Sequence, residues 1–468
     1  MIKKIFSHSL IYAIGPQIPK VIGLFLLPLL TPNLTRNDFG IWGTIMAYTM
    51  FFTSARDLGL TVPLLNSFYK SKQRWVWVWR QIIAYLLSFG VFIAVAQGLL
   101  LFFVFPESAS KDKVLIISFL TIQCLLFDVP ILIGTRYFQI LEKPVGISII
   151  SIFSGLLSIG IQYYCIVNLK MGYLGWFYAN FISIGAMALC YLLVLLKLKF
   201  YPIFSFKYLK PRLRVALPMI PHNYSSYLLN SSDRVILDFY KIPISQIGLY
   251  NLSYMWGNYM EVLGNAIGTA VGPMYFQLFN EEKNNKVLKS YYLTDFLQAL
   301  FVVGSFLVAI WSKELFSLFI KNNNLIEAYS IAIVIVMSYS YRPLYWGIVN
   351  KMQFEENTRR LWKISFFSGM LNVVLNLILV PFFGFKVVAF TTFFALIYQG
   401  FIGYTFKENR NIIKRGKLLF WLALILFSTF LAFFYKDSSI LFKTVISILS
   451  LSLCFVYIRK SIKILISK

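Results

Sequence analysis

Long apolar stretches recur along almost the whole chain, and they constrain its fold more than any other feature. Each stretch is about 20 residues long, the length that an α-helix needs to cross the ~30 Å hydrocarbon layer of a membrane. Of the 468 residues, 59% are hydrophobic and only 13% are charged, which is too apolar for a soluble domain of this size. The sequence therefore predicts an all-α, polytopic membrane protein.

The apolar stretches predict about fourteen transmembrane helices. The first follows a basic N-terminal segment without a small-residue cleavage site, so we expect it to be retained as a span. No part of the chain is left over for a soluble domain. The predicted spans are 7–31, 39–68, 81–105, 114–136, 144–167, 172–196, 213–239, 246–279, 290–311, 326–349, 361–381, 387–406, 417–435 and 440–458.

The basic residues fix the expected orientation. The net charge of +26 would suggest nucleic-acid binding in a soluble protein, but the lysines and arginines lie between spans, so we expect no nucleic-acid partner. Roughly thirty of the 44 basic residues fall in alternate connections, which the positive-inside rule assigns to the cytoplasm. We therefore expect both termini to be cytoplasmic. Trp75, Trp77 and Trp79 lie beside these charges and are expected to anchor the helix at the membrane interface.

The chain repeats itself weakly at an offset of about 200 to 215 residues. The offset spans an even number of helices, which predicts two parallel six-helix lobes around a central cavity, followed by a separate helix pair. The expected divisions are 1–200, 201–408 and 409–468. The matched segments are Pro16-Gln17-Ile18-Pro19 with Pro218-Met219-Ile220-Pro221, Phe39-Gly40-Ile41-Trp42 with Ile247-Gly248-Leu249-Tyr250, Phe153-Ser154-Gly155 with Phe367-Ser368-Gly369, and Gly172 with Gly384.

The matched proline pairs are candidate hinges. Each proline removes a backbone donor and bends a helix, although a single proline is common in transmembrane helices without such a role. Because both halves carry the pair near the start of a span, we interpret Pro16, Pro19, Pro218 and Pro221 as hinges or helix breaks beside the cavity.

Several short motifs, taken in their order and spacing, carry a resemblance to a known family. The segments concerned are Leu34-Thr35-Arg36-Asn37-Asp38-Phe39-Gly40, Asp57-Leu58-Gly59-Leu60, Leu217 to His222, Ser231 to Leu237, Ile247 to Tyr250, Leu371 to Asn376, Pro381 and Phe383-Gly384. In these segments the chain resembles the O-antigen and capsular polysaccharide flippases, which form the polysaccharide-transporter branch of the multidrug, oligosaccharidyl-lipid and polysaccharide exporter (MOP) superfamily. Lys386-Val387-Val388-Ala389 departs from the Gly-Ala-Ala that many relatives have there.

This resemblance implies a function in surface polysaccharide biosynthesis. It implies a V-shaped fold of fourteen helices in the bacterial inner membrane, with a cationic cavity. It also implies that the chain flips undecaprenyl-pyrophosphate carrying an oligosaccharide repeat unit, for O-antigen or another surface polysaccharide, from the cytoplasmic to the outer leaflet by alternating access. The expected partners are this lipid-linked oligosaccharide, membrane lipids, and the polysaccharide polymerase and chain-length machinery.

Four basic residues lie well inside predicted spans, away from their ends. A charged side chain at mid-bilayer costs at least ~2.5 kcal/mol on insertion scales, so such residues usually face a cavity or a partner. Arginine binds phosphate through two hydrogen bonds and lysine through a point charge. We therefore hypothesise that these cations bind the pyrophosphate, the alternative being that Arg56 pairs with Asp57 and Arg234 with Asp233. The four are Lys20, Arg56, Arg234 and Arg342.

Acidic residues within spans are candidates for ion coupling, because a proton or Na⁺ bound there can drive alternation. They are Asp57, Asp128, Asp233 and Glu261, with Asp295 at the edge of a span. Glu261 and Asp128 are the stronger candidates because no basic residue is their sequence neighbour. We expect no metal site and no cofactor other than such a coupling H⁺ or Na⁺.

Three other functions compete with this interpretation. One is a flippase for another cell-envelope lipid precursor, and another is a drug exporter of the same superfamily, although cationic drugs would need acidic cavity walls. The third is a membrane polysaccharide polymerase or ligase. The chain has no P-loop, nucleophile motif or long outer loop, so we expect it not to be an enzyme.

Overall fold

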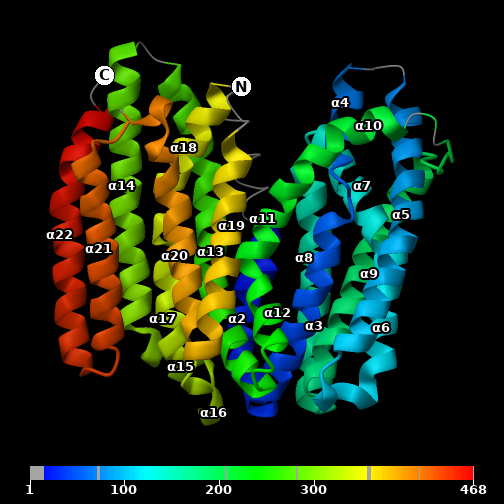
Figure 1. The fold of residues 1–468 in the computed structure, drawn as a ribbon, viewed down its shortest axis with the longest axis horizontal. Helices are drawn as coiled ribbons and strands as arrows, with labels where there is room; N and C mark the ends of the chain where they lie inside the picture. The colour runs from blue at the N-terminus through cyan, green and yellow to red at the C-terminus, as the bar shows by residue number, and fades with distance from the viewer. Residues whose placement is uncertain are drawn as a thin grey trace. The chain divides into compact units, whose positions relative to one another are not determined.

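Every described element of the chain is helical (Figure 1). The structure is a computed structural model that describes residues 15–70, 74–205, 207, 209–280, 283–355, 360–410 and 412–466. The chain divides into two compact units, residues 1–248 and 249–468. Each unit is described by itself below, and the long helix α13 (Ile244–Phe279) begins in the first and continues in the second.

The described part of the first unit contains seven continuous or interrupted helical passages and the start of α13. Its 3₁₀ segments include η1 (Gly15–Gln17), η2 (Thr31–Asn33), η3 (Glu107–Asp112) and η7 (Leu217–Met219), and its π-helical segments are η4 (Gln123–Phe127) and η5 (Tyr164–Asn168). Its α-helices are α2 (Ile18–Leu30), α3 (Arg36–Ala55), α4 (Thr61–Lys70), α5 (Trp75–Val104), α6 (Lys113–Ile122), α7 (Asp128–Ile140), α8 (Pro144–Tyr163), α9 (Tyr173–Lys197), α10 (Leu209–Ala216), α11 (Ile220–Asn230) and α12 (Ser232–Phe239).

The second unit continues from α13 through nine further α-helices. A 3₁₀ turn, η8 (Tyr339–Tyr341), joins two of them. They are α14 (Lys283–Ile310), α15 (Ser312–Phe319), α16 (Asn323–Ile326), α17 (Tyr329–Ser338), α18 (Arg342–Phe354), α19 (Leu361–Phe383), α20 (Val387–Phe401), α21 (Arg415–Phe434) and α22 (Ile440–Ile466).

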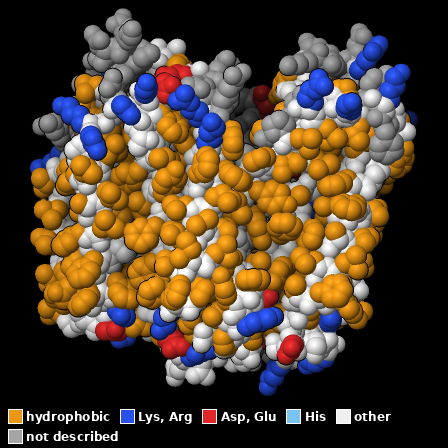
Figure 2. Space-filling model, in the orientation of Figure 1, with side chains coloured by type: hydrophobic (Ala, Val, Ile, Leu, Met, Phe, Trp, Pro, Cys, Tyr) orange, Lys and Arg blue, Asp and Glu red, His pale blue; other side chains and the backbone are white. Residues whose placement is uncertain are grey.

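Ten helices within the described residues are long and apolar enough to span a membrane. The other predicted spans correspond to shorter, broken or more polar helices at 18–33, 36–70, 220–239 and 244–279, which are the first, second, seventh and eighth. The first of these, at 18–33, is apolar but shorter than a full span. Figure 2 shows hydrophobic side chains over the middle of the helices and most lysines and arginines near their ends.

Asp38 caps two helices at once and explains part of the Thr35–Gly40 motif. Its carboxylate accepts hydrogen bonds from the Thr35 backbone N–H at 2.7 Å and from the Tyr173 N–H at the start of α9 at 2.8 Å. Thr35 in turn accepts from the Asp38 N–H, completing a capping box on α3. The side chain is 8% exposed, so these bonds are shielded from water.

The repeated Phe-Gly-Ile-Trp and Ile-Gly-Leu-Tyr segments meet where α3 crosses the start of α13. A Cβ atom on Gly40 would lie 2.0 Å from the Ile244 carbonyl oxygen, and one on Gly248 would lie 1.8 Å from the Arg36 carbonyl oxygen. Gly40 thus contacts Ile244, four residues before Gly248, and Gly248 contacts Arg36, four residues before Gly40. Only glycine permits this mutual backbone contact, which explains why both matched segments contain it.

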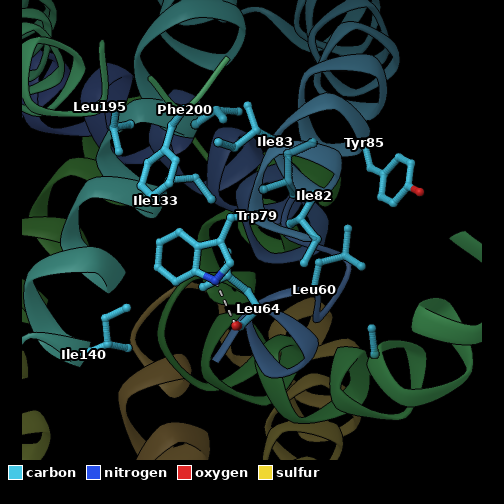
Figure 3. Packing of buried hydrophobic residues seen from close by; sticks show 13 residues of the cluster. Leu60, Leu64, Trp79, Ile82, Ile83, Tyr85, Ile133, Ile140, Leu195 and Phe200 are labelled. Atoms are coloured by element: carbon cyan, nitrogen blue, oxygen red, sulfur yellow. Dashed lines mark hydrogen bonds between the residues drawn. The ribbon is translucent and has the colours of Figure 1, made fainter. Parts of the chain in front are cut away.

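Trp79 belongs to a buried core and not to the membrane interface, which corrects the expectation for this member of the tryptophan triplet. Its ring is fully buried among Ile133 on α7, Phe200 and residues of α4 and α5 (Figure 3). The indole N–H donates to the Leu64 carbonyl oxygen at 3.0 Å. Trp77, two residues earlier, is 39% exposed, as an interfacial residue would be.

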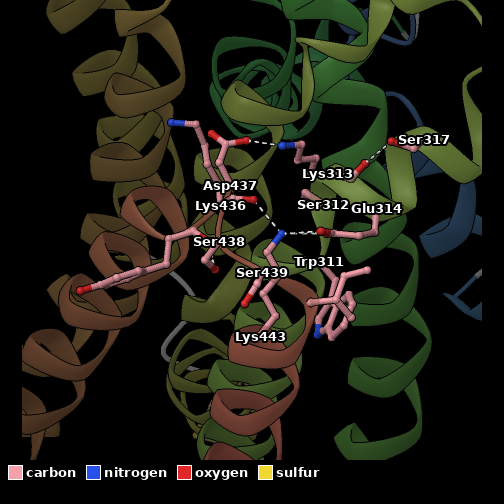
Figure 4. Close-up of polar contacts among 12 residues, drawn as sticks. Trp311, Ser312, Lys313, Glu314, Ser317, Lys436, Asp437, Ser438, Ser439 and Lys443 are labelled. Carbon is pink, nitrogen blue, oxygen red and sulfur yellow. Dashed lines mark hydrogen bonds and ion pairs between the residues drawn. The ribbon is translucent and has the colours of Figure 1, made fainter.

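The pair α21 and α22 packs on α14 and is held there by polar contacts at both ends. At one end Lys443 is fully buried and bonds both carboxylate oxygens of Glu314 at 2.7 and 2.9 Å and the Lys436 carbonyl oxygen at 2.7 Å (Figure 4). At the other end the Asp295 carboxylate accepts from Tyr457 at 2.7 Å and from Trp421 at 3.0 Å. Between these ends lies an apolar cavity of about 330 Å³.

Candidate functional site

The second predicted span is broken between α3 and α4, and this break positions the first pair of charges. Leu58 and Gly59 have φ angles of +48° and +70°, a left-handed turn that interrupts the helix. A Cβ atom on Gly59 would lie 2.2 Å from the Ala216 carbonyl oxygen, so the turn also sits against the end of α10. The Asp57–Leu60 motif therefore makes a break within the apolar layer.

Asp57 stabilises this break through two local hydrogen bonds and one to α11. Its carboxylate accepts from the Gly59 N–H at 3.0 Å, from the Thr61 hydroxyl at 2.9 Å and from the Asn223 amide on α11 at 3.2 Å. These bonds satisfy backbone and side-chain donors that the interrupted helix leaves without partners.

Arg56 forms an ion pair with Asp128, and not with its sequence neighbour Asp57. Arg56 is the residue that ends α3, and Asp128 is the first residue of α7, directly after the π-helical segment η4. The side chains are 17% and 9% exposed. Arg56 was predicted to bind phosphate and Asp128 to couple ions, and the structure places the two side chains in contact.

Arg342 forms the corresponding pair in the second unit. Its Nη2 lies 3.1 Å from Oε1 of Glu261, and its Nη1 donates to the Asn265 side-chain oxygen at 2.7 Å. The guanidinium carbon lies 5.3 Å from the centre of the Tyr339 ring, a cation–π contact. The Tyr339 hydroxyl also donates to Glu261, at 3.4 Å. The Arg342 side chain is 11% exposed, and the Glu261 side chain is 27% exposed.

Local sequence explains how Arg342 reaches this position. Pro343 follows it and cannot donate a backbone hydrogen bond, which is consistent with the 3₁₀ turn η8 just before the arginine. Gly264 on α13 lets the side chain lie flat against that helix, because a Cβ atom there would lie 2.8 Å from the Arg342 Cδ. Glu261 and Asn265 flank this glycine on the same face of α13.

The two ion pairs join helices that the predicted repeat makes equivalent, with their charges exchanged. Asp128 and Arg342 are 214 residues apart, as are the matched Phe153 and Phe367. In the first unit the arginine lies on the second predicted span and the carboxylate on the fourth. In the second unit the carboxylate lies on the eighth predicted span and the arginine on the tenth.

The remaining predicted cations lie elsewhere in the first unit. Lys20 is exposed on α2 and has no ion-pair partner among the residues that the structure describes. Arg234 on α12 is 5% exposed and donates to the Asn230 carbonyl oxygen. Asp233, beside it, is fully buried. Their roles in substrate binding or ion coupling stay predictions.

The matched proline pairs produce the same local structure in both halves. Pro16 lies in the 3₁₀ turn η1, and Pro19 is the second residue of α2. Pro218 lies in the 3₁₀ turn η7, and Pro221 is the second residue of α11. Each pair therefore joins a tight turn to the first turn of a helix, a position that proline tolerates well. Whether they act as hinges stays a prediction.

Several residues around the charges were missed by sequence reasoning. Asn265 and Tyr339 complete the Arg342 site, and the spacing of Glu261, Gly264 and Asn265 at three and four residues was the available signal. Asp238 on α12 was also missed, and it accepts a hydrogen bond from Tyr48 of α3 at 2.7 Å. Nothing local in the sequence indicates this contact, because 190 residues separate the two.

Solved structures of membrane transporters share this fold. A lipid II flippase, MurJ, in an inward closed conformation aligns with a TM-score of 0.68 at 16% identity, covering 96% of this chain and 99% of that one. A multidrug resistance MATE family transporter of the MOP superfamily aligns in its inward-facing conformation with a TM-score of 0.62 at 13% identity, covering 92% and 96%. A multidrug resistance MATE family transporter of the MOP superfamily in an outward-facing conformation aligns with a TM-score of 0.56 at 14% identity, covering 93% of this chain and 97% of that one.

The family assignment rests on a match of sequence over more than half of the chain. No protein of curated function matches the sequence significantly. The model of the family described as polysaccharide biosynthesis protein matches residues 2–279, a range that includes the broken second span and the Arg56–Asp128 pair. The chain is therefore a membrane protein that belongs to the polysaccharide biosynthesis protein family.

Proposed function

We propose that this chain is a flippase for undecaprenyl-pyrophosphate-linked oligosaccharide repeat units in the synthesis of O-antigen or another surface polysaccharide. It moves them from the cytoplasmic to the outer leaflet of the bacterial inner membrane by alternating access of lobes 1–200 and 201–408. Both termini lie in the cytoplasm, and the product passes to the polymerase and chain-length machinery.

The observation that carries this proposal is a largely buried arginine in each unit: Arg56 at the break between α3 and α4, and Arg342 within an apolar span. A lone charge at this depth is costly, and an arginine is well suited to phosphate because its planar fork donates two parallel hydrogen bonds. The family supports a polysaccharide substrate, and the fold shared with a lipid II flippase supports translocation of a lipid-linked molecule.

The membrane potential is a sufficient energy source for the proposed movement. Moving one negative charge outward through an inside-negative potential releases ~2.3 kcal/mol per 100 mV, and a doubly charged pyrophosphate releases about twice that. Coupling to H⁺ or Na⁺ can add to this drive, and Asp128 and Glu261 remain the proposed coupling groups. Each is paired with an arginine, so the pair must separate before the carboxylate takes up a cation.

The test is outward exposure of the pyrophosphate-linked glycan in sealed vesicles that contain wild-type protein or a single variant. We expect Arg342→Ala, Arg56→Ala and Lys20→Ala to reduce exposure at matched membrane insertion. The control is Lys313→Ala, because Lys313 forms an exposed pair with Asp437, with side chains 43% and 52% exposed. Wild-type exposure in all three variants would contradict phosphate binding by these residues.

The same vesicles discriminate the competing functions. A second set contains lipid II in place of the oligosaccharide lipid, and a third contains a fluorescent cationic dye. Translocation of lipid II alone would replace the proposed substrate by another cell-envelope precursor. Extrusion of the dye alone would favour drug export, and elongation of the glycan by the purified chain would favour a polymerase.

A further inference from the structure

The buried cations of this chain differ in how fully their hydrogen-bond donors are used. Lys443 has three N–H donors, and all three have acceptors, namely both oxygens of Glu314 and the Lys436 carbonyl. Arg342 has five donors, and its buried Nε has no hydrogen-bond partner within the described part of the chain. The Arg342 site is therefore incompletely satisfied, whereas the Lys443 site is complete.

The anion that holds Arg342 is the weakest element of its site. Glu261 approaches it with one oxygen at 3.1 Å, so the contact is not the two-bond fork that arginine forms with carboxylates and phosphates. With 27% of its side chain exposed, Glu261 is more accessible than the arginine at 11%. Asn265 approaches more closely, at 2.7 Å, but carries no charge. A ligand with more oxygens and more negative charge can therefore compete with Glu261.

A pyrophosphate is such a ligand. It presents several oxygens to the guanidinium and carries more charge than one carboxylate, and arginine–phosphate contacts are often bidentate. It cannot bind beside an ionised Glu261 without like-charge repulsion. Binding therefore requires the carboxylate to leave the guanidinium, which its flexible side chain allows.

We infer that Glu261 is an internal competitor for the phosphate of the substrate. It neutralises Arg342 when no substrate is bound, and the substrate's phosphate takes its place during transport. Glu261 therefore weakens binding and speeds release. This inference rests on the proposed function. It assigns Asp128 the same role toward Arg56, because the predicted repeat makes the helices of the two pairs equivalent, with their charges exchanged.

The experiment measures binding of farnesyl pyrophosphate, a short isoprenoid pyrophosphate, to the purified full-length chain in detergent by isothermal titration calorimetry. The variants are Glu261→Gln, which keeps the side-chain shape and removes its charge, and Asp128→Asn. The matched control is Asp437→Asn, which neutralises the carboxylate of an exposed lysine pair. We expect Kd to fall about tenfold in Glu261→Gln, a typical size for energetic coupling between two sites, and to stay unchanged in Asp437→Asn.

Two further measurements keep the result interpretable. The double variant Glu261→Gln/Arg342→Gln should lose the gain in affinity, because the gain acts through the arginine. Equal or weaker binding in both Glu261→Gln and Asp128→Asn, with elution profiles like that of the wild type, would overturn the inference and make the pairs structural. If Glu261→Gln binds farnesyl pyrophosphate more tightly but the wild-type chain flips no glycan in vesicles, the role of Glu261 as a competitor is supported and the proposed substrate is rejected.

Discussion

Replacing Asp38 by alanine tests whether one carboxylate caps two helices. The change removes the α3 capping box, which typically contributes ~1 kcal/mol. It also removes the charge-assisted bond to the Tyr173 N–H, which at 2.8 Å and 8% exposure contributes about 2 kcal/mol. The expected loss in free energy of unfolding is therefore about 3 kcal/mol, because the two bonds stabilise different helices.

The assay is unfolding of the purified chain by SDS in mixed micelles, followed by tryptophan fluorescence. Thr35→Ala removes the hydroxyl half of the capping box, leaves the bond to α9 in place and should cost ~1 kcal/mol. Asn37→Ala is the matched control because Asn37 is an exposed neighbour, and it should cost less than about 0.5 kcal/mol. If Asp38→Ala costs no more than Thr35→Ala, the bond to α9 contributes nothing and the reasoning is wrong.

Three further predictions use the same unfolding assay. Gly40→Ala should lose about 1 to 3 kcal/mol, because its Cβ would lie 2.0 Å from a carbonyl oxygen of the crossing helix; a neutral result would contradict that close approach. Glu314→Ala should cost about 3 to 5 kcal/mol by leaving Lys443 unpaired, whereas the double change Glu314→Leu/Lys443→Met should cost far less, and equal costs would refute this. Lys313 donates to Asp437 and lowers the pKa of that carboxyl below its ordinary value. The contribution of this ion pair to the free energy of unfolding is therefore present above about pH 4 and is lost as pH falls through the lowered pKa. Asp437→Asn should therefore flatten the stability profile between pH 5 and 3, and an unchanged profile would contradict the assignment.

Sequence reasoning predicted the helical membrane architecture well because hydrophobicity is a local property. The ten long apolar helices in the described residues all fall on predicted spans, and the family resemblance is confirmed by the match to polysaccharide biosynthesis proteins. The matched prolines and glycines were also informative, since Gly172 and Gly384 share positive φ angles of 55° and 69°. The six-helix lobes and the count of fourteen helices stay predictions.

The partners of the buried charges could not be predicted in the same way. Sequence adjacency suggested Asp57 as an alternative partner for Arg56, but the left-handed turn at Leu58 and Gly59 directs Asp57 to local donors. The true partner, Asp128, is held by a π-helical segment that hydropathy does not reveal. The prediction for Trp79 was wrong for a related reason: an interfacial and a core tryptophan have the same local sequence pattern.

The buried Lys443 has a consequence for how the chain is assembled during synthesis. Its partner Glu314 is made 129 residues earlier, so the carboxylate is already in the membrane when the ribosome reaches the lysine. A helix with a lone lysine partitions poorly from the translocon into lipid. The ion pair between α22 and α15 can therefore form only late in synthesis, and a second unit that misassembles leaves Lys443 without its carboxylate.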